Sequence, residues 1–176
     1  MQNSPRRKIT KNGKWLTMEI ASILVPERTF SDVETTSKKR AIEKVSNLIA
    51  SVELGLDAHE LYSNLIAREK LGPTAIGNGI AIPHCRIACS SIVGSLFRLS
   101  NGIEFGALDD LPVRIMFVLL VPQYEAKDHL HTLAMLARKF ESEMYRNGLL
   151  EAKDSRELFE MALTDIEEMT QPNVAG

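Results

Sequence analysis

The sequence predicts a layered α/β domain, with helices on either side of a buried strand. Residues 113–121 are almost entirely apolar and are bracketed by Pro112 and Pro122, which is typical of a central strand buried on both faces. Helical periodicity is present both before and after this run. The chain has 176 residues, enough to bury a core of its own. We therefore expect one α/β domain over most of the chain.

Two helices are expected before the glycine-rich part of the chain. Ser37 or Thr36 begins the first, whose apolar positions follow a helical period: Ala41, Ile42, Val45, Leu48, Ile49 and Val52. Asp57 followed by Glu60 resembles a capping box and begins the second. The inward stripe of this helix comprises Leu61, Leu65 and Arg68, with Glu69 and Lys70 pointing elsewhere, and the helix ends at Gly72 and Pro73.

Strands and two further helices complete the prediction. A short glycine-rich strand is expected near residues 79–82 and a longer one near 92–99. Asp128 is expected to cap a third long helix and Asp154 a last short one. The inward residues of the third helix are predicted to be Leu130, Leu133, Ala134, Ala137 and Phe140.

Charge is distributed unevenly along the chain. The net charge is −2, which argues against a nucleic-acid partner recognised by bulk electrostatics. Residues 1–14 nevertheless carry five basic side chains and no acid, so the remainder sums to −7. We expect this segment to be a disordered basic tail, either solvated or touching an acidic partner. The domain is expected to span residues 15–165, followed by a C-terminal tail at 166–176.

The sequence contains no sign of membrane insertion or secretion. No run of about 18 apolar residues is present, and the charged N-terminal region lacks the apolar stretch of a secretory signal. Cys85 and Cys89 have no second pair with which to form a zinc site. We therefore expect a cytoplasmic protein with reduced thiols, no metal and no membrane insertion.

His84 is the strongest candidate for chemistry, because it ends a glycine-rich segment. Pro83 fixes the backbone before it, and Gly77 and Gly79 let the chain bend sharply. Together with Asn78, these glycines are expected to form a phosphate-binding loop whose backbone N–H groups cradle an anion. A neutral imidazole nitrogen can attack phosphorus without an activating base. The spacing alone leaves open a structural histidine that ends a buried strand.

Arg68 is a candidate partner for a phosphate on His84. It occupies the apolar stripe of its helix, and a guanidinium on an inward face needs an anionic partner. A short turn separates Arg68 from the glycine-rich segment, so its planar fork of donors could bind a phosphoryl group there. The alternative is an arginine at the helix end that binds its own C-terminal carbonyls.

The other histidines and Cys85 have different expected roles. His129 and His131 begin the third helix about 200° apart, so they cannot both face one site. His129 is the better candidate for an accessory hydrogen bond to a phosphoryl group at the helix N-terminus. His59 is expected to be exposed on the polar side of its helix. Cys85 is expected to point away from His84, as a buried or half-buried side chain without thiol chemistry.

These motifs resemble a known bacterial family. The segment 68–84, from REKLGPT to IGNGIAIPH, is similar to the active segment of the fructose/mannitol-type enzyme IIA (EIIA) domains of the phosphoenolpyruvate-dependent phosphotransferase system. Residues 119–122 and 129–133 resemble specifically the nitrogen-regulatory branch, the stand-alone enzyme IIA-Ntr, and residues 37–41 fit the same branch. The resemblance covers roughly residues 16–165.

The resemblance implies a three-layer arrangement, in which a mixed β-sheet is flanked by helices on both sides. It also implies reversible phosphorylation of His84, with Arg68 supporting the phosphate and His129 as the second active-site histidine. His131 matches the nitrogen-regulatory branch but takes no general role from the family. Cys85 stands where a glycine is usual after the histidine, so the local loop geometry differs from the family pattern.

The predicted function is a phosphoryl carrier of the nitrogen-related phosphotransferase system, with neither a metal nor a cofactor. By resemblance, an HPr-like phosphocarrier donates the phosphoryl group to His84. The phosphorylated or free form then binds regulators of nitrogen, carbon and potassium metabolism, such as sensor kinases or potassium transport regulators. Two alternatives stay open: a binding regulator that keeps the EIIA fold without being phosphorylated, and an EIIA component feeding a sugar permease.

Overall fold

The computed structural model describes residues 19–124 and 128–165. In this part of the chain, six strands form one mixed sheet in the order β1–β5–β6–β3–β2, and β4 also pairs with β6. The strands are β1 (Thr29–Val33), β2 (Ala75–Gly77), β3 (Ile80–Ala81), β4 (His84–Ile87), β5 (Val93–Ile103) and β6 (Val113–Pro122). The helices are α1 (Lys38–Val52), α2 (Ala58–Lys70), α3 (Asp128–Glu141), α4 (Glu143–Glu151) and α5 (Ser155–Ala162), and the 3-10 turns are η1 (Ile20–Ser22) and η2 (Pro26–Arg28). The predicted tails at 1–14 and 166–176 lie outside the described residues.

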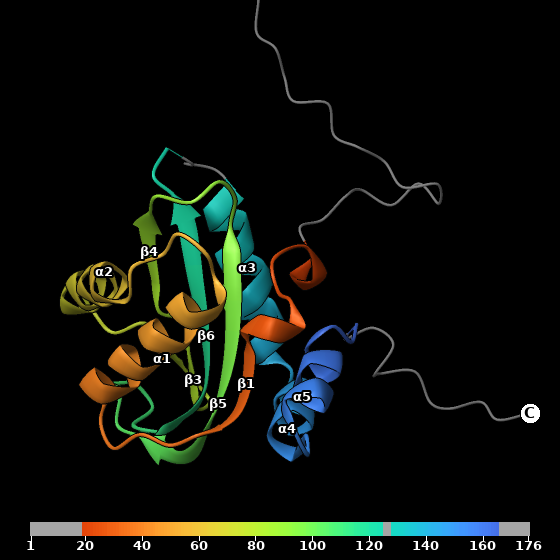
Figure 1. Ribbon diagram of the computed structural model, residues 1–176. Helices are drawn as coiled ribbons and strands as arrows, with labels where there is room; N and C mark the ends of the chain where they lie inside the picture. Colours follow the sequence, from red (N-terminus) through yellow and green to blue (C-terminus); the bar gives the residue numbers. More distant parts are fainter. Residues whose placement is uncertain (1–18, 125–127, 166–176) are drawn as a thin grey trace, which may run out of the picture.

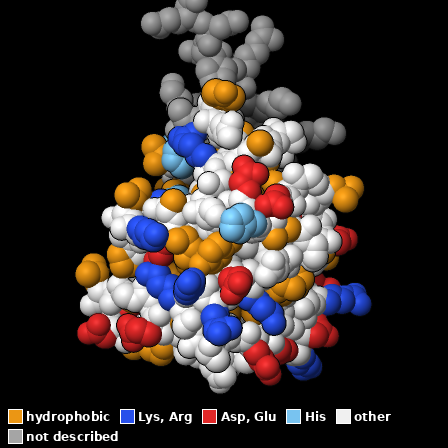
Figure 2. Space-filling view, turned by 60° about the vertical axis from the view of Figure 1, so that its left-hand side comes forward, with side chains coloured by type: hydrophobic (Ala, Val, Ile, Leu, Met, Phe, Trp, Pro, Cys, Tyr) orange, Lys and Arg blue, Asp and Glu red, His pale blue; other side chains and the backbone are white. Residues whose placement is uncertain are grey.

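Helices cover both faces of the sheet (Figure 1). α1 and α2 pack on one face in a core cluster that includes Ile42, Leu61 and Phe97. α3, α4 and α5 pack on the other face, where Leu136 and Tyr145 belong to a second cluster. The predicted three-layer α/β arrangement with a mixed sheet is therefore confirmed. On the surface of the α1 and α2 side, Lys and Arg side chains share the face with Asp, Glu and hydrophobic side chains (Figure 2).

The apolar run 113–121 forms β6, which pairs with β5 on one side and with β3 and β4 on the other. Because successive side chains of a strand point to opposite faces, the run supplies both core clusters. The α1 and α2 side receives Val113, Met116, Val118 and Leu120. The α3 side receives Ile115, Phe117, Leu119 and Val121. The predicted central strand buried on both faces is confirmed.

Side-chain caps begin the helices at the predicted places. Ser37, Asp57 and Asp154 each accept a hydrogen bond from a backbone N–H in the first turn of α1, α2 and α5. α4 was not expected, although Ser142 caps it in the same way. Asp128 is the first residue of α3 rather than a residue before it. Within the described residues, no helix is both long and apolar enough to cross a bilayer.

The inward face of α3 differs from the prediction at two positions. Leu130 is 61% exposed and Ala134 is also exposed, so the expectation that both face inward was wrong. The buried positions are Thr132, Leu136 and Phe140, which are spaced four residues apart along one side of the helix. The apolar pattern was therefore broader than the face that packs on the sheet.

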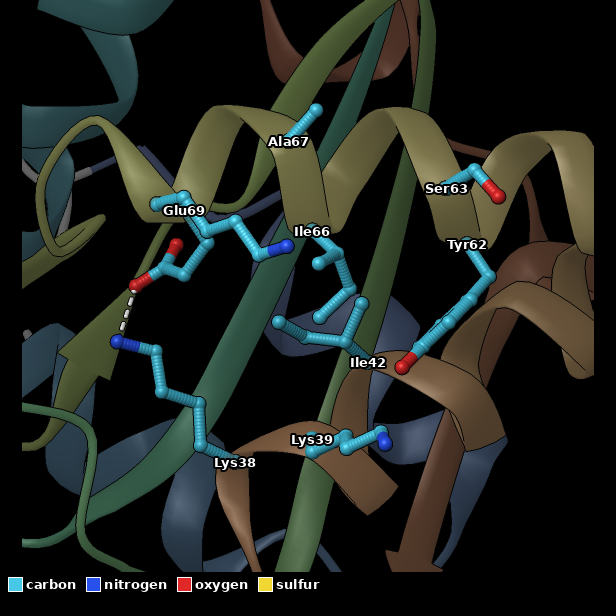
Figure 3. A pocket seen from close by; sticks show the side chains of 9 residues that line it. Lys38, Lys39, Ile42, Tyr62, Ser63, Ile66, Ala67 and Glu69 are labelled. Atoms are coloured by element: carbon cyan, nitrogen blue, oxygen red, sulfur yellow. Dashed lines mark ion pairs between the residues drawn. The ribbon is translucent and has the colours of Figure 1, made fainter.

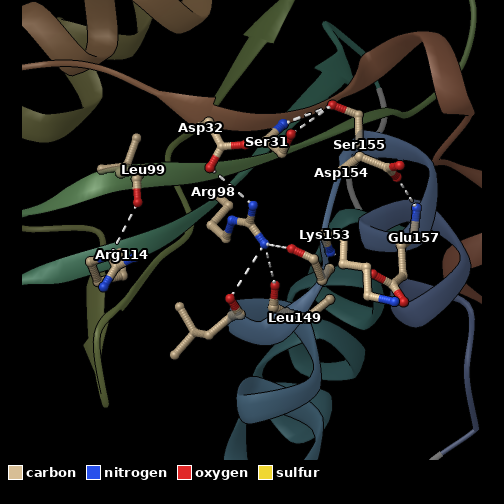
Figure 4. Close-up of polar contacts among 12 residues, drawn as sticks. Ser31, Asp32, Arg98, Leu99, Arg114, Leu149, Lys153, Asp154, Ser155 and Glu157 are labelled. Carbon is tan, nitrogen blue, oxygen red and sulfur yellow. Dashed lines mark hydrogen bonds and ion pairs between the residues drawn. The ribbon is translucent and has the colours of Figure 1, made fainter.

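Arg98 of β5 fixes the end of α4 to the sheet (Figure 4). Its guanidinium donates to the carbonyl oxygens of Leu149, Leu150 and Ala152, at the C-terminal end of α4. It also pairs with the Asp32 carboxylate at 3.0 Å. The carbonyls that end a helix lack intrahelical partners, so Arg98 satisfies them in a buried place.

Candidate functional site

His84 is the first residue of β4, which follows β3 along the same side of the central strand β6. Both pair with β6 in parallel and in one register, with Ile80 opposite Ile115 and His84 opposite Leu119. Pro83 lies between β3 and β4 and has no N–H to donate, but its carbonyl accepts from Leu119 at 2.9 Å. The sheet therefore determines where the backbone of His84 lies.

Arg68 reaches His84 from the last turn of α2. Its Nε donates to Nε2 of His84 at 3.2 Å, and its Nη1 donates to the carbonyl of Gly72 at 3.0 Å. One guanidinium therefore contacts the histidine and also a carbonyl just past its own helix. The bond to Gly72 fixes the orientation of the fork.

The hydrogen bonds of His84 define its tautomer. Its Nδ1 lies 2.8 Å from the carbonyl oxygen of Ile82. Because a carbonyl only accepts, the proton is assigned to Nδ1, and the lone pair of the neutral ring is on Nε2. The donor from Arg68 points at this lone pair. Nε2 is therefore the ring nitrogen that can act as a nucleophile.

Electrostatics keep the His84 ring neutral. Burial lowers the pKa of His84, the positive charge of Arg68 lowers it further, and His129 acts in the same direction. The hydrogen bond to Ile82 and the charge of Glu69 act in the opposite direction, but the net pKa stays below its ordinary value. At pH 7 the ring is uncharged, because histidine ordinarily titrates near about 6.5.

Of the two histidines on α3, His129 is the less exposed. It is half-buried, and its electrostatic effect on His84 lowers the pKa of that ring. Its Nδ1 is buried and has no hydrogen-bond partner among the described residues. An unsatisfied buried N–H is costly, so the tautomer with a proton on Nε2 is favoured. His131 is exposed, as expected because it lies two positions from His129 and points to another side of α3. His59 of α2 is also exposed, as expected.

The glycine-rich segment makes a tight turn between β2 and β3. Gly77, Asn78 and Gly79 all have positive φ angles, of 90°, 56° and 77°, a region that glycine and asparagine tolerate best. The N–H of Asn78 donates to the Asp109 carboxylate at 2.7 Å. This amide is therefore already bound within the protein, and the glycines are explained by the turn itself.

The same turn lies far from His84. The carbonyl of Gly79 accepts a hydrogen bond from the N–H of Arg114 in β6. His84 pairs with Leu119, five positions further along the same strand. Five positions along an extended strand correspond to roughly 16 Å. The structure thus does not bring the predicted phosphate-binding loop to His84, because the extended backbone between them carries the turn away. We do not retain a phosphate role for Gly77, Asn78 and Gly79.

Two neighbours of the site have roles in the packing. The expectation that Glu69 points away from the core was wrong, since it is 7% exposed and lies 2.6 Å from Lys38. The apolar pattern of a helix cannot predict that a carboxylate is buried, because this burial depends on partners from other segments, here Lys38. Cys85 is buried in the cluster on the α1 and α2 side, where burial raises the pKa of its thiol to about 12. This burial agrees with the expectation for Cys85 and argues against thiolate chemistry.

Comparison with known proteins assigns the chain to a family. Residues 22–164 match the family described as the phosphoenolpyruvate-dependent sugar phosphotransferase system, EIIA 2. The chain belongs to this family. A nitrogen regulatory protein of Pseudomonas aeruginosa is 39% identical to it over 147 residues, covering 83% of this chain and 96% of that protein.

Further relatives show which branch of the EIIA family this chain resembles. The nitrogen regulatory protein of Escherichia coli K12 is 39% identical over 153 residues, covering 86% of this chain and 93% of that protein. The crystal structure of nitrogen regulatory protein IIA-Ntr from Neisseria meningitidis matches with a TM-score of 0.76 and 35% identity, covering 81% of this chain and 98% of that one. The resemblance to the nitrogen-regulatory branch of the EIIA family is confirmed.

Proposed function

We propose that this EIIA chain carries a phosphoryl group on Nε2 of His84, within the domain at residues 15–165. One observation carries the proposal. The ring donates from Nδ1 to Ile82 at 2.8 Å, which leaves an unprotonated Nε2 facing the Arg68 guanidinium at 3.2 Å. A nucleophilic nitrogen and a cationic donor for phosphate oxygens are thus already adjacent.

The transfer requires no change of protonation at His84. The lone pair of Nε2 attacks the phosphorus of a phosphohistidine on the donor, whose ring is protonated on its other nitrogen. The N–P bond of the donor breaks, its electron pair returns to the ring nitrogen, and the donor leaves as a neutral imidazole. Nδ1 keeps its proton throughout, so the phosphorylated ring carries a positive charge. The carbonyl of Ile82 accepts from this N–H and favours the charged ring. Catalysis then depends on positioning and charge stabilisation.

Two side chains support the phosphoryl group in this proposal. On phosphorylation, the Arg68 donor that now faces Nε2 is expected to turn to a phosphoryl oxygen, while its bond to Gly72 keeps the guanidinium in place. His129 is expected to donate from Nε2, because its Nδ1 is buried without a partner among the described residues. Preorganised donors of this kind are worth the most where charge develops.

We infer that the donor is an HPr-like phosphocarrier and that the output is regulatory. Family membership supports the first inference, and the relatives named nitrogen regulatory proteins support the second. The phosphoryl group itself carries a charge of about −2, and together with the positive ring it makes the site more negative by about one charge. Such a charge attracts one partner and repels another. We place this exchange in the cytoplasm, with regulators of nitrogen, carbon or potassium metabolism as the targets.

A labelling experiment tests the carrier role. The protein is incubated with labelled phosphoenolpyruvate, an HPr-like carrier and the enzyme that phosphorylates this carrier from phosphoenolpyruvate, and the label on this chain is measured. The parent and His59→Ala, which changes an exposed histidine of α2, are expected to take up label, and His84→Ala none. Equal labelling of His84→Ala would refute the assignment. A pull-down that compares His84→Ala with His84→Asp then identifies partners that depend on the charge.

A further inference from the structure

Glu69 occupies a buried position between α2 and the segment that follows it. Its Oε1 accepts from the backbone N–H of Thr74 at 3.0 Å, and its Oε2 accepts from the Thr74 hydroxyl at 2.6 Å. Lys38 of α1 lies 2.6 Å from Oε1, at one end of a groove between α1 and α2 (Figure 3). The carboxylate therefore binds both donors of Thr74 and one ammonium.

The hydrogen bonds continue from Thr74 to the histidine. The carbonyl of Thr74 accepts from the N–H of Ile82 at 3.0 Å. The carbonyl of the same Ile82 accepts from Nδ1 of His84 at 2.8 Å. Successive bonds are joined through the backbone of one residue, first Thr74 and then Ile82. A series of hydrogen bonds and backbone links thus connects the carboxylate of Glu69 with the ring of His84.

Ile82 is the residue through which this series reaches His84. Ile82 lies between β3 and β4, next to Pro83, which cannot donate to a neighbouring strand. Its N–H binds Thr74 and its carbonyl binds His84, so neither group belongs to the pairing with β6. The bond to Thr74 holds the backbone of Ile82 just before the carbonyl that accepts from Nδ1, so the position of that acceptor depends in part on Thr74.

We propose that Glu69 is a positioning residue that acts through Thr74 and Ile82 to hold His84 in the Nδ1-protonated form. By fixing Thr74, Glu69 keeps the Ile82 carbonyl directed at Nδ1 and leaves Nε2 available as the acceptor. The inference deepens the proposed function and rests on it, although the tautomer can be measured without any phosphoryl transfer.

The presence of Lys38 fits this role. A carboxylate removed from water is costly unless it is paired and hydrogen-bonded. Lys38 supplies the charge, and it is itself held by the carbonyl of Phe105 at 3.1 Å and by the ring of Phe105, whose centroid is 5.0 Å away. An apolar side chain would join the two helices without this cost. The polar arrangement is explained if its purpose is to orient Thr74.

The test measures the tautomer of His84 in the full-length chain by ¹⁵N NMR of its ring nitrogens. Thr74→Val removes the hydroxyl but keeps the backbone donor, and Glu69→Gln removes the charge. Each is expected to raise the population of the Nε2-protonated form roughly five- to tenfold, the equivalent of about one hydrogen bond. Thr74→Ser, which retains both donors, is expected to match the parent, as is Glu43→Gln, which changes an exposed acid of α1.

Rates and unfolding curves separate positioning from stability. In the labelling assay the rate is expected to fall by a similar factor in Thr74→Val and Glu69→Gln and to be restored in Thr74→Ser. If Thr74→Val loses stability while its tautomer and rate stay as in the parent, the role is structural and the proposal is overturned. If the tautomer shifts but the parent takes up no label, the carrier function fails while the positioning role of Glu69 stands.

Discussion

The Nε of Arg68 lies 3.2 Å from Nε2 of His84. The nitrogen that we propose as the phosphoryl acceptor therefore already accepts a hydrogen bond from a cationic donor. The two residues are 16 positions apart in the sequence, but α2 and β4 bring them together. This relationship makes Arg68 the first residue to test.

Replacing Arg68 is expected to slow phosphoryl transfer to His84. Arg68→Ala removes both the charge and the fork of donors, so we expect a loss of roughly a hundredfold in the single-turnover rate. Arg68→Lys keeps the charge without the fork and should lose roughly tenfold. Arg40→Ala, which changes an exposed arginine of α1, is the control. Transfer to Arg68→Ala at the parent rate would show that the contact with His84 has no catalytic use.

The two histidines of α3 offer a matched comparison. His129 is half-buried and lowers the pKa of His84, whereas His131 is exposed. His129→Ala is expected to reduce the transfer rate roughly tenfold, in the range for one positioned donor or acid. His131→Ala is expected to stay within about twofold of the parent, because its side chain points away from the site. The same single-turnover assay measures both, and equal losses would contradict the assignment.

Acceptance of the phosphoryl group is expected to fail only at acid pH. Burial and the charge of Arg68 hold the pKa of His84 below its ordinary value, and His129 acts in the same direction. The ring then stays neutral at about pH 6.5 and above, and the rate falls as the pH drops through the lowered pKa. Arg68→Gln removes one positive charge and should move the midpoint to higher pH. NMR titration of the His84 ring measures it, and a parent midpoint above about 6.5 would be inconsistent with this account.

The turn at Gly77 and Gly79 is expected to affect stability without affecting transfer. Hydrogen bonds from the backbone N–H groups of Asn78 and Leu111 lower the pKa of the Asp109 carboxyl. A lowered pKa means that the stabilisation is present at neutral pH and is lost as the pH falls through that pKa. Asp109→Asn should therefore be slightly less stable at pH 7, with a difference that shrinks in acid. Its transfer rate should equal that of the parent. A large loss of rate would show instead that the turn contributes to phosphate binding.

Arg98 is expected to be important for stability. Its side chain is 7% exposed, and Arg98→Met would leave the carbonyls at the end of α4 without their donor. We expect a loss of about 3 kcal/mol in the free energy of unfolding, measured by denaturant titration. Asp32→Ala should lose less than about 1 kcal/mol, because that side chain is 66% exposed. A loss in Asp32→Ala as large as that in Arg98→Met would assign the effect to the ion pair instead.

Much of the fold could be predicted because its signals are local. The caps Ser37, Asp57 and Asp154 precede helices whose first-turn N–H groups they satisfy, and the apolar run 113–121 marks a strand buried on both faces. α4 was missed, since its buried residues Tyr145 and Leu149 give too short a pattern. The face of α3 was placed too broadly, because only packing on the sheet selects among several apolar positions.

By itself, the sequence determined the layered architecture, the central strand, and the candidates His84, Arg68 and His129, because periodicity, caps and motifs depend on nearby residues. Only the tertiary structure decided which nitrogen of His84 carries the proton, that Glu69 is buried, and that the glycine turn lies far from the histidine. These depend on contacts between distant segments, such as Ile82 with Thr74 and Glu69 with Lys38. Hydrogen-bond direction and burial belong to the packed molecule, so no local pattern records them.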